Sequence, residues 1–110
     1  MPSKQYSMDG IDEHELQRAL VNRLRGWKQS GKALERTFEF VDFRTALAFV
    51  NEVGDKAEDL QHHPDIDIRY SRVKLILSSH DANEITRRDL ILAGYINEIA
   101  PRYQRHPRSA

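Results

Sequence analysis

Two short runs of alternating apolar residues, separated by only two positions, most constrain how this chain can fold. The runs are Ile66, Ile68, Tyr70 and then Val73, Leu75, Leu77. A period of two is typical of a strand with one buried face, and the phase flips between the runs. A tight turn at Ser71 and Arg72 explains the flip and predicts an antiparallel hairpin. In that register Ile68 faces Leu75, and residue 63 faces residue 80.

Three of the chain's five histidines stand at the ends of this hairpin. His62 and His63 precede Pro64, and the expected pairing brings His80 back beside them. Imidazole can both give and take a proton near neutral pH, so several imidazoles around one pocket could serve one substrate. Three histidines could equally hold a catalytic zinc ion. His-His-Pro could also be a solvated helix end that interacts well with the helix dipole.

The N-terminal part of the chain predicts a helix followed by another hairpin. Asp12 is the expected N-cap, with Glu15 in capping-box spacing, and Gly26 is the expected stop. The dipeptide Ser30-Gly31 predicts the turn of the hairpin. One helical face and one strand face are apolar at Leu16, Ala19, Leu20, Leu24 and at Leu34, Phe38, Phe40.

Two further helices are expected on either side of the histidine hairpin. The first begins after an N-cap at Asp42 and must end before Pro64, because the residue before a proline is biased away from helical dihedrals. The second begins with Thr86 and Asp89 in capping-box spacing and is expected to end at Pro101. Its apolar stripe is Leu92, Ala93, Ile96, Ile99, Ala100.

This order of elements predicts an α+β fold, with one four-stranded antiparallel sheet and three helices packed on one face. The order is α-β-β-α-β-β-α, and the other face of the sheet is left open. We expect a flexible N-terminus over residues 1–11, one domain over 12–103, and a disordered tail over 104–110.

Composition excludes several classes of function. A chain of 110 residues is the size of one domain, and its 17 basic and 17 acidic residues cancel, so nothing electrostatic favours nucleic acid or an anionic membrane. No apolar run approaches the roughly 20 residues of a membrane span, and the first residues lack the apolar core of a signal peptide. Without cysteine, disulfides and thiolate metal sites are impossible. A cytoplasmic protein is the expectation.

A set of spacings resembles the pterin-4a-carbinolamine dehydratase family. The matching positions are Glu58, His62, His63, Pro64, Tyr70, His80, Asp89. The segment from Ala57 to Ala100 is similar to the family throughout, and the likeness extends over roughly Leu16 to Ala100, including Gly26–Lys28 and Phe38–Val53. The combination of spacings is specific, whereas His-His-Pro alone would be weak.

The resemblance implies an activity and its participants. Family members dehydrate 4a-hydroxytetrahydropterin to quinonoid dihydropterin, which recycles the pterin used by aromatic amino acid hydroxylases. It assigns proton transfer to His62, His63 and His80, with a pterin substrate and neither a metal nor another cofactor. It also implies a homodimer or homotetramer, and a hydroxylase in the same pathway.

Further residues are expected to bind or orient the substrate. Glu58 lies one helical turn before His62 and could orient an imidazole, and Asp89 could set a histidine tautomer as well as cap its helix. Trp27 could stack over the pterin, although a lone tryptophan is more often core. Gln61 and Pro64 flank the histidines. Gln61 stands where the family often has Asp or Asn.

Other departures and alternatives bear on specificity and on function. An aromatic residue is common in the family where Ile66 stands, so pocket polarity and substrate preference follow less directly than the chemistry. A histidine metal-binding protein is one alternative. A non-catalytic dimerisation module of the transcriptional coactivator type is another, since some family members also partner homeodomain transcription factors.

Overall fold

The order of helices and strands confirms the expected α+β class. A computed structural model describes residues 10–104, and the expectations for residues 1–9 and 105–110 lie outside them. The helices are α1 (Glu13–Asn22), α2 (Phe43–Leu60) and α3 (Arg87–Gln104), and the strands are β1 (Lys28–Ser30), β2 (Ala33–Glu39), β3 (Asp65–Arg69) and β4 (Arg72–Leu77). Ile11, inside the segment expected to be flexible, packs against the core.

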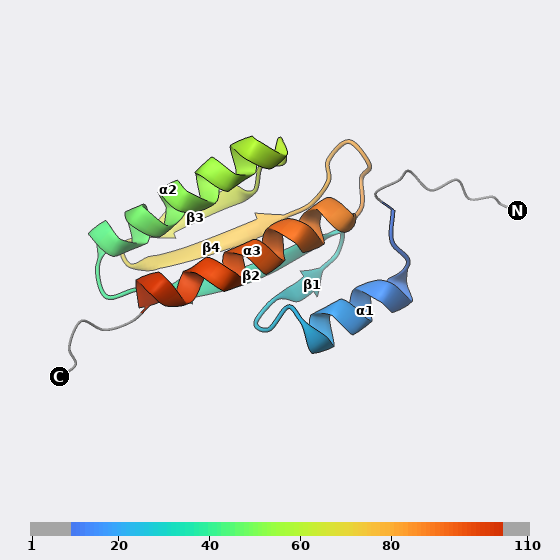
Figure 1. Cartoon of the computed structure of the whole chain (residues 1–110), viewed down its shortest axis with the longest axis horizontal. Coiled ribbons are helices and arrows are strands. Elements are labelled where there is room, and N and C mark those ends of the chain that lie inside the picture. The colour runs from blue at the N-terminus through green and yellow to red at the C-terminus, as the bar shows by residue number, and fades with distance from the viewer. Residues whose placement is uncertain (1–9, 105–110) are drawn as a thin grey trace, which may run out of the picture.

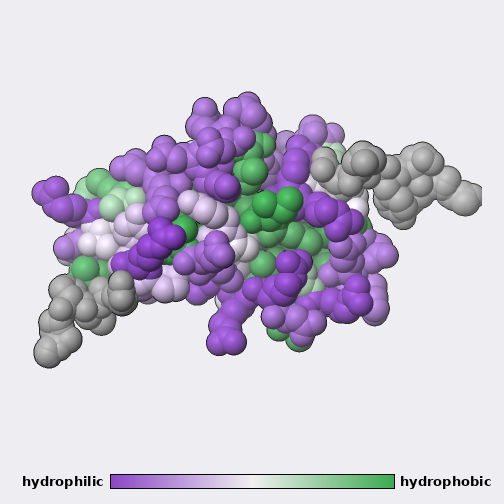
Figure 2. All heavy atoms as spheres, viewed as in Figure 1, coloured by the Kyte–Doolittle hydropathy of each residue, from purple (hydrophilic) through white to green (hydrophobic). Residues whose placement is uncertain are grey.

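All four strands form one antiparallel sheet in the order β1-β2-β4-β3. The helices lie on one face of this sheet, as expected, with α2 and α3 side by side and α1 next to β1 (Figure 1). Hydrophilic residues cover most of the helical side, and apolar residues gather right of its centre (Figure 2). The opposite face carries charged residues in ion pairs, including Arg72 with Glu39 and Lys74 with Glu35.

Two predicted N-caps begin the first two helices. The Asp12 carboxylate accepts from the Glu15 backbone N–H at 2.8 Å, and the Asp42 carboxylate accepts from that of Thr45 at 2.8 Å. Each bond satisfies a donor that the helix cannot satisfy internally, which typically contributes about 1 kcal/mol.

The core lies between the sheet and the two long helices. Apolar side chains of β2 and β4 meet one face each of α2 and α3, and burying each large side chain contributes about 1.5–3 kcal/mol. Fully buried members are Leu34, Phe38, Ala46, Phe49, Val53, Val73, Leu75, Leu77, Leu92, Ala93, Ile96, Ile99. The buried stripe of α2 runs through Phe49 and Val53, which leaves Phe43 and Leu47 exposed at its edge.

The register of the histidine hairpin differs from the expected one by two residues. Ile68 pairs with Val73 rather than Leu75, so the turn consists of Tyr70 and Ser71. The Ser71 carbonyl accepts from the Phe40 N–H at 2.9 Å, which continues the β2–β4 pairing by one residue and holds Ser71 beside the end of β2. A shift of two preserves which face each side chain occupies. Tyr70, expected to pack on the sheet, is a turn residue with φ 54° and is 69% exposed.

Three other boundaries differ from expectation. Helix α1 ends at Asn22, before the expected stop at Gly26. Gly31 and Lys32 form the first hairpin's turn, because Ser30 still pairs with Ala33. Helix α3 continues through Pro101 to Gln104. Its last turn is anchored from outside the helix, since the Gln104 amide donates to the Glu39 carbonyl at 3.0 Å.

Candidate functional site

The end of α2 places His62 and His63 in different environments. Gln61 caps the helix in the left-handed conformation, with φ 52° and ψ 46°. The His62 backbone N–H then donates to the Ala57 carbonyl at 3.0 Å, which is the type of closure seen when a left-handed residue ends a helix. This turn directs His62 inward, where it is 6% exposed, and leaves the His63 side chain 56% exposed.

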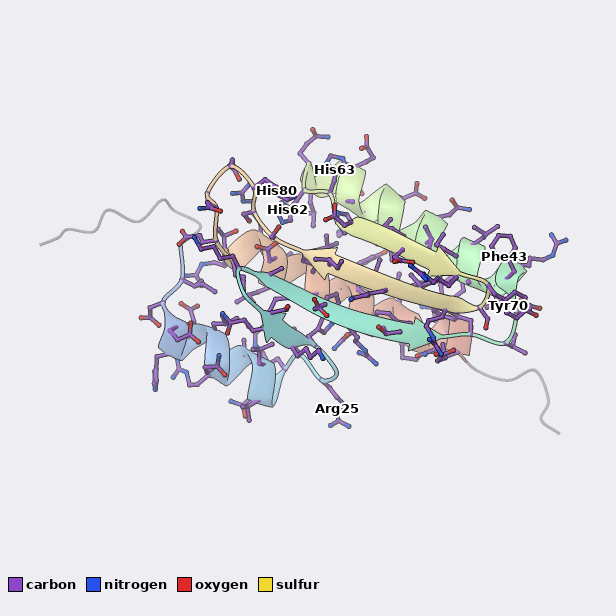
Figure 3. The ribbon with its side chains drawn as sticks, turned by 180° about the vertical axis from the view of Figure 1, so that it is seen from behind. Arg25, Phe43, His62, His63, Tyr70 and His80 are labelled. Carbon is purple, nitrogen blue, oxygen red and sulfur yellow. The ribbon has the colours of Figure 1, made fainter. Side chains whose placement is uncertain are left out.

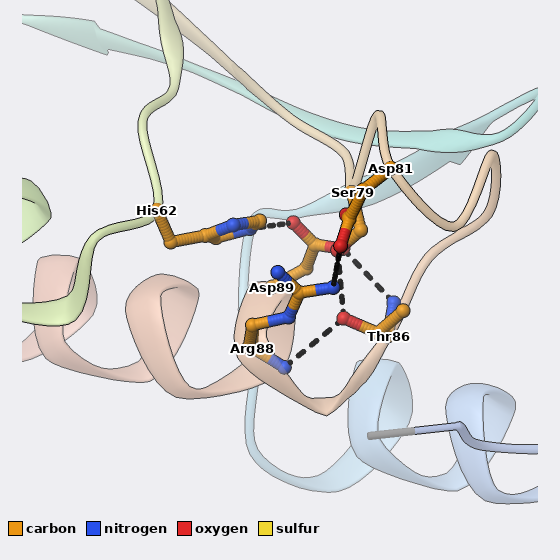
Figure 4. A network of polar contacts seen from close by, with 6 residues as sticks. All are labelled: His62, Ser79, Asp81, Thr86, Arg88 and Asp89. Atoms are coloured by element: carbon orange, nitrogen blue, oxygen red, sulfur yellow. Dashed lines mark hydrogen bonds and ion pairs between the residues drawn. The ribbon is translucent and has the colours of Figure 1, made fainter. Parts of the chain in front are cut away.

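His62 meets a buried carboxylate on the first turn of α3. Its Nε2 lies 2.6 Å from Oδ1 of Asp89, which has no exposed surface. The other oxygen, Oδ2, accepts from the Ser79 hydroxyl and from the Thr86 backbone N–H, each at 2.9 Å. The Ser79 and Thr86 hydroxyls are 2.7 Å apart, which closes the network (Figure 4).

The hydrogen-bond pattern determines how the His62 ring is held. An ionised carboxylate can only accept hydrogen bonds, so the proton between His62 and Asp89 belongs to Nε2. Nδ1 is then the nitrogen that can take up or release a proton. A carboxylate behind an imidazole sets its tautomer and orientation and stabilises the imidazolium. Three hydrogen bonds to Asp89 offset the cost of burying its charge.

His63 has its own carboxylate partner at the surface. Its Nε2 lies 2.6 Å from Oε2 of Glu58. The one-turn spacing of the sequence pointed instead to His62, whose ring contacts Asp89. The Gln61 amide donates to the Glu58 backbone carbonyl at 2.8 Å, which links the cap to the same turn. An exposed pair contributes little to stability, so orienting the His63 ring is its main physical effect.

His80 lies at the same end of the sheet as the other two histidines (Figure 3). It follows Ser79 in the loop between β4 and α3, and the Ser79 carbonyl organises this loop by accepting from Ala82 and Asn83 at 3.0 and 2.7 Å. The β3–β4 ladder does not extend to His80, so the prediction that residues 63 and 80 pair directly is wrong. Within residues 10–104, the exposed His80 ring makes no hydrogen bond.

Trp27 lies in the core rather than among the histidines. Its indole N–H donates to the Asn97 side chain at 2.7 Å, and its ring meets Phe38 edge-on with centroids 6.2 Å apart. Phe38 pairs with Val73, near the start of β4, whereas the network around Asp89 lies beyond the other end of that strand. Pro64 is half-buried directly before β3.

Residues that the sequence did not single out complete the site. Ser79 is buried and bonded to Asp89, and Arg88 forms an ion pair with Asp81 beside His80. A serine next to a candidate histidine has no distinctive sequence pattern, so only the fold shows the role of Ser79. The sequence places Arg88 next to Asp89, but the partner of Arg88 depends on the path of the loop. Among the described residues, no group of three or more His, Asp or Glu could hold a metal ion.

Comparison with known proteins places this chain in a family. The fold and site define an α+β protein that gathers histidines, two of them backed by carboxylates, at one end of its sheet. Residues 9–99 match the family model described as pterin 4 alpha carbinolamine dehydratase. The chain belongs to this family.

Individual relatives support the same assignment. A protein of Koribacter versatilis is 53% identical over 83% of this chain and 96% of its own length, and one of Thermomicrobium roseum is 50% identical over 74% and 88%. Both carry the name "Putative pterin-4-alpha-carbinolamine dehydratase". A solved transcriptional coactivator/pterin dehydratase from Brucella melitensis matches with a TM-score of 0.79 and 35% identity, covering 84% of this chain and 99% of that one.

A more distant structure shares the fold alone. It is a pterin dehydratase-like protein identified as a RuBisCO assembly factor, with a TM-score of 0.60 and 20% identity over 69% of this chain and 90% of that one.

No helix among the described residues is long and apolar enough to cross a membrane.

Proposed function

We propose that this protein dehydrates 4a-hydroxytetrahydropterin to quinonoid dihydropterin by histidine general acid–base catalysis. Family membership supports a pterin carbinolamine dehydratase. The observation that carries the catalytic proposal is the placement of His62, His63 and His80 at one end of the sheet, with Asp89 and Glu58 behind the first two. In the same proposal the protein acts in the cytoplasm, in a pathway with an aromatic amino acid hydroxylase.

The reaction requires two proton transfers and no redox step. The bond between C4a and the hydroxyl oxygen breaks, and the oxygen leaves as water after taking a proton from an imidazolium. N5 loses its proton to a neutral imidazole, and the electron pair of that N–H bond forms the double bond between N5 and C4a. Each positioned proton transfer is typically worth about 10²- to 10⁴-fold in rate.

Two of the three histidines each contact a carboxylate, which can stabilise the imidazolium that forms when the ring takes up a proton. Asp89 stabilises positive charge on His62 in a buried setting, and Glu58 does so for His63 in an exposed one. His80 has no such partner among the described residues, so the three imidazoles occupy three distinct environments. Such differences allow one group to donate while another accepts.

The test is an absorbance assay of chemically generated 4a-hydroxytetrahydropterin, with the wild-type protein and a His63→Ala, His80→Ala double variant. Both side chains are exposed, so the double variant should fold, with an unchanged circular dichroism spectrum. We expect turnover to fall much more than substrate binding, because proton transfer is lost while ring contacts remain. Near-wild-type turnover in the folded double variant would contradict the catalytic proposal and would favour histidines that are only solvated surface residues.

The same assay distinguishes the metal-binding alternative. The proposed chemistry requires no Lewis acid, so chelators should leave the rate unchanged. Activity that is abolished by chelation and restored by zinc would replace the acid–base proposal with a metal-assisted one.

A further inference from the structure

The loop between β4 and α3 presents a His80 ring that forms no hydrogen bond with any other residue in the range 10–104. Its position therefore depends on the chain neighbours on either side, Ser79 and Asp81. Ser79 is buried and bonded to Asp89, on the first turn of α3. Asp81 also reaches that turn, because the Arg88 guanidinium contacts both of its carboxylate oxygens, at 3.0 and 3.2 Å.

We infer that the Asp81–Arg88 ion pair is a positioning device that holds His80 in place for the dehydration proposed above. The inference rests on that proposed function for its catalytic meaning. The pair and the Ser79–Asp89 hydrogen bond attach both neighbours of His80 to one turn of α3, the turn that also holds His62. The relative positions of two catalytic histidines are then set by a single structural unit.

The Asp81–Arg88 pair differs from a local surface ion pair in the elements that it joins. The Arg88 side chain is 28% exposed and that of Asp81 is 70% exposed. One guanidinium nitrogen, Nη2, contacts both carboxylate oxygens. The pair also joins a loop to a helix, seven residues apart in sequence. By contrast, Arg69 and Asp67 form a similar Arg–Asp pair within one strand, which holds no other element.

The loop needs such an attachment because its backbone turns sharply after His80. Asn83 has φ 55°, in the left-handed region. Its N–H contacts the His80 carbonyl at 3.2 Å in addition to that of Ser79. These bonds close the loop upon itself, but they do not attach the residues after Ser79 to the helix. Among the described contacts, Asp81 supplies that attachment.

The primary test replaces Asp81 by asparagine, with Asp67→Asn as the matched control. Asp81→Asn removes the charge of an exposed side chain and should fold normally. We expect kcat to fall about tenfold with KM changed by less than about twofold, because misplacing a catalytic group by about 1 Å is costly. Asp67→Asn loses the same charge on the open sheet face and should leave both constants unchanged.

A direct readout follows the loop without relying on turnover. Backbone amide order parameters of residues 80–83 should fall from about 0.85 toward about 0.6 in Asp81→Asn, and stay unchanged in the Asp67→Asn control. Arg88→Gln should reproduce both effects, and combining it with Asp81→Asn should add little, since the two residues act as a unit. Arg88→Lys should recover part of the activity.

The outcomes separate this inference from the proposed function. An inactive wild-type protein would overturn the function, while the order parameters would still judge the ion pair. An active wild-type protein whose loop order and kcat are unaffected by Asp81→Asn would overturn the positioning role alone. Loss of loop order with full kcat would also overturn it, because His80 would then work without being held.

Discussion

Under the proposed function, Asp89 contributes both to the stability of the fold and to the chemistry. One oxygen accepts from His62 and the other from Ser79 and the Thr86 backbone. In Asp89→Asn the amide oxygen can still accept from the last two, but the NH₂ group faces His62 and forces its proton onto Nδ1. We expect kcat to fall about 10²- to 10⁴-fold, whereas the lost charged bonds cost only about 1–3 kcal/mol of folding free energy.

The measurement pairs turnover per folded molecule with urea unfolding. A matched control is Asp42→Asn, which changes another helix-capping aspartate. Its carboxylate accepts from the Thr45 N–H and forms no hydrogen bond with a histidine in the part of the chain that the structure describes. This control should lose some stability and no intrinsic activity. If the turnover of Asp89→Asn fell only in proportion to its unfolded fraction, Asp89 would be a structural cap alone.

At the scale of the elements, much was predictable because local signals are strong. Alternation, capping aspartates and Pro64 predicted every helix and strand in order. The hairpin register failed by two residues because it depends on Tyr70 adopting a positive φ, for which a tyrosine gives no signal. The predicted end of α3 at Pro101 is wrong because tertiary contacts hold a further turn of the helix. The sequence suggested that Asp89 could orient a histidine, but which histidine it contacts and which residue pairs with Asp81 depend on a loop path that no periodicity encodes.

Helix α2 contains a glycine whose replacement should stabilise the protein. A Cβ atom added to Gly54 meets no heavy atom within 4 Å, and its backbone has no positive φ. Gly54→Ala should therefore raise the free energy of unfolding by about 1 kcal/mol, through the difference in helix propensity. Chemical denaturation measures this gain. Gly26→Ala is the contrasting variant, since its φ is +89° and the new atom meets Arg36; both variants gaining stability would contradict the argument.

A polar cluster joins α2 to α3 and makes the contribution of this contact to folding stability depend on pH. Glu52 accepts from Tyr103, from Tyr95 at 3.1 Å and from Arg102 at 3.1 Å. The Tyr103 hydrogen bond is the main cause that lowers the pKa of Glu52, with the Tyr95 bond and Arg102 adding to it against partial burial. The same hydrogen bond, with burial and the Glu52 charge, raises the pKa of Tyr103.

The signs of these shifts define the expected stability profile. A lowered carboxyl pKa stabilises the fold above the unfolded value near 4.3 and loses that contribution as pH falls through the folded value. A raised phenol pKa stabilises the fold below about 10 and loses that contribution as pH rises. Unfolding of wild type and Glu52→Gln across pH 2–7 should therefore show a difference that narrows with acidity. A constant difference would indicate that the cluster contributes through packing alone.

At the scale of the whole molecule, unpartnered edges favour self-association. Strand β3 is an outer strand of the sheet, and Phe43, Leu47 and Ile66 expose apolar surface along α2 and β3. Edge strands and exposed apolar groups offer ready pairing surfaces. We propose a homo-oligomer, formed by joining sheets or packing helices.

Light scattering at micromolar concentration measures the assembly directly. Leu47→Glu should dissociate an oligomer that packs through α2, and Ile66→Glu one that joins through β3. Val21→Glu is the control, since Val21 is also apolar, is 81% exposed and lies on α1, away from both proposed contact surfaces. A stable wild-type mass of 12.8 kDa would contradict the prediction.

If Asp89 serves both folding and catalysis, as proposed, this has a consequence for the evolution of the chain. Selection for folding alone would keep an aspartate at this position in a lineage that had abandoned the reaction, because α3 still needs its first turn. His63 and His80 have no such second task and would be free to drift. His62 would be replaced by another hydrogen-bond donor rather than at random, since Oδ1 of a buried carboxylate must still be satisfied. Among descendants of such a chain, a retained aspartate at position 89 together with altered histidines would identify a protein that has lost the catalytic activity.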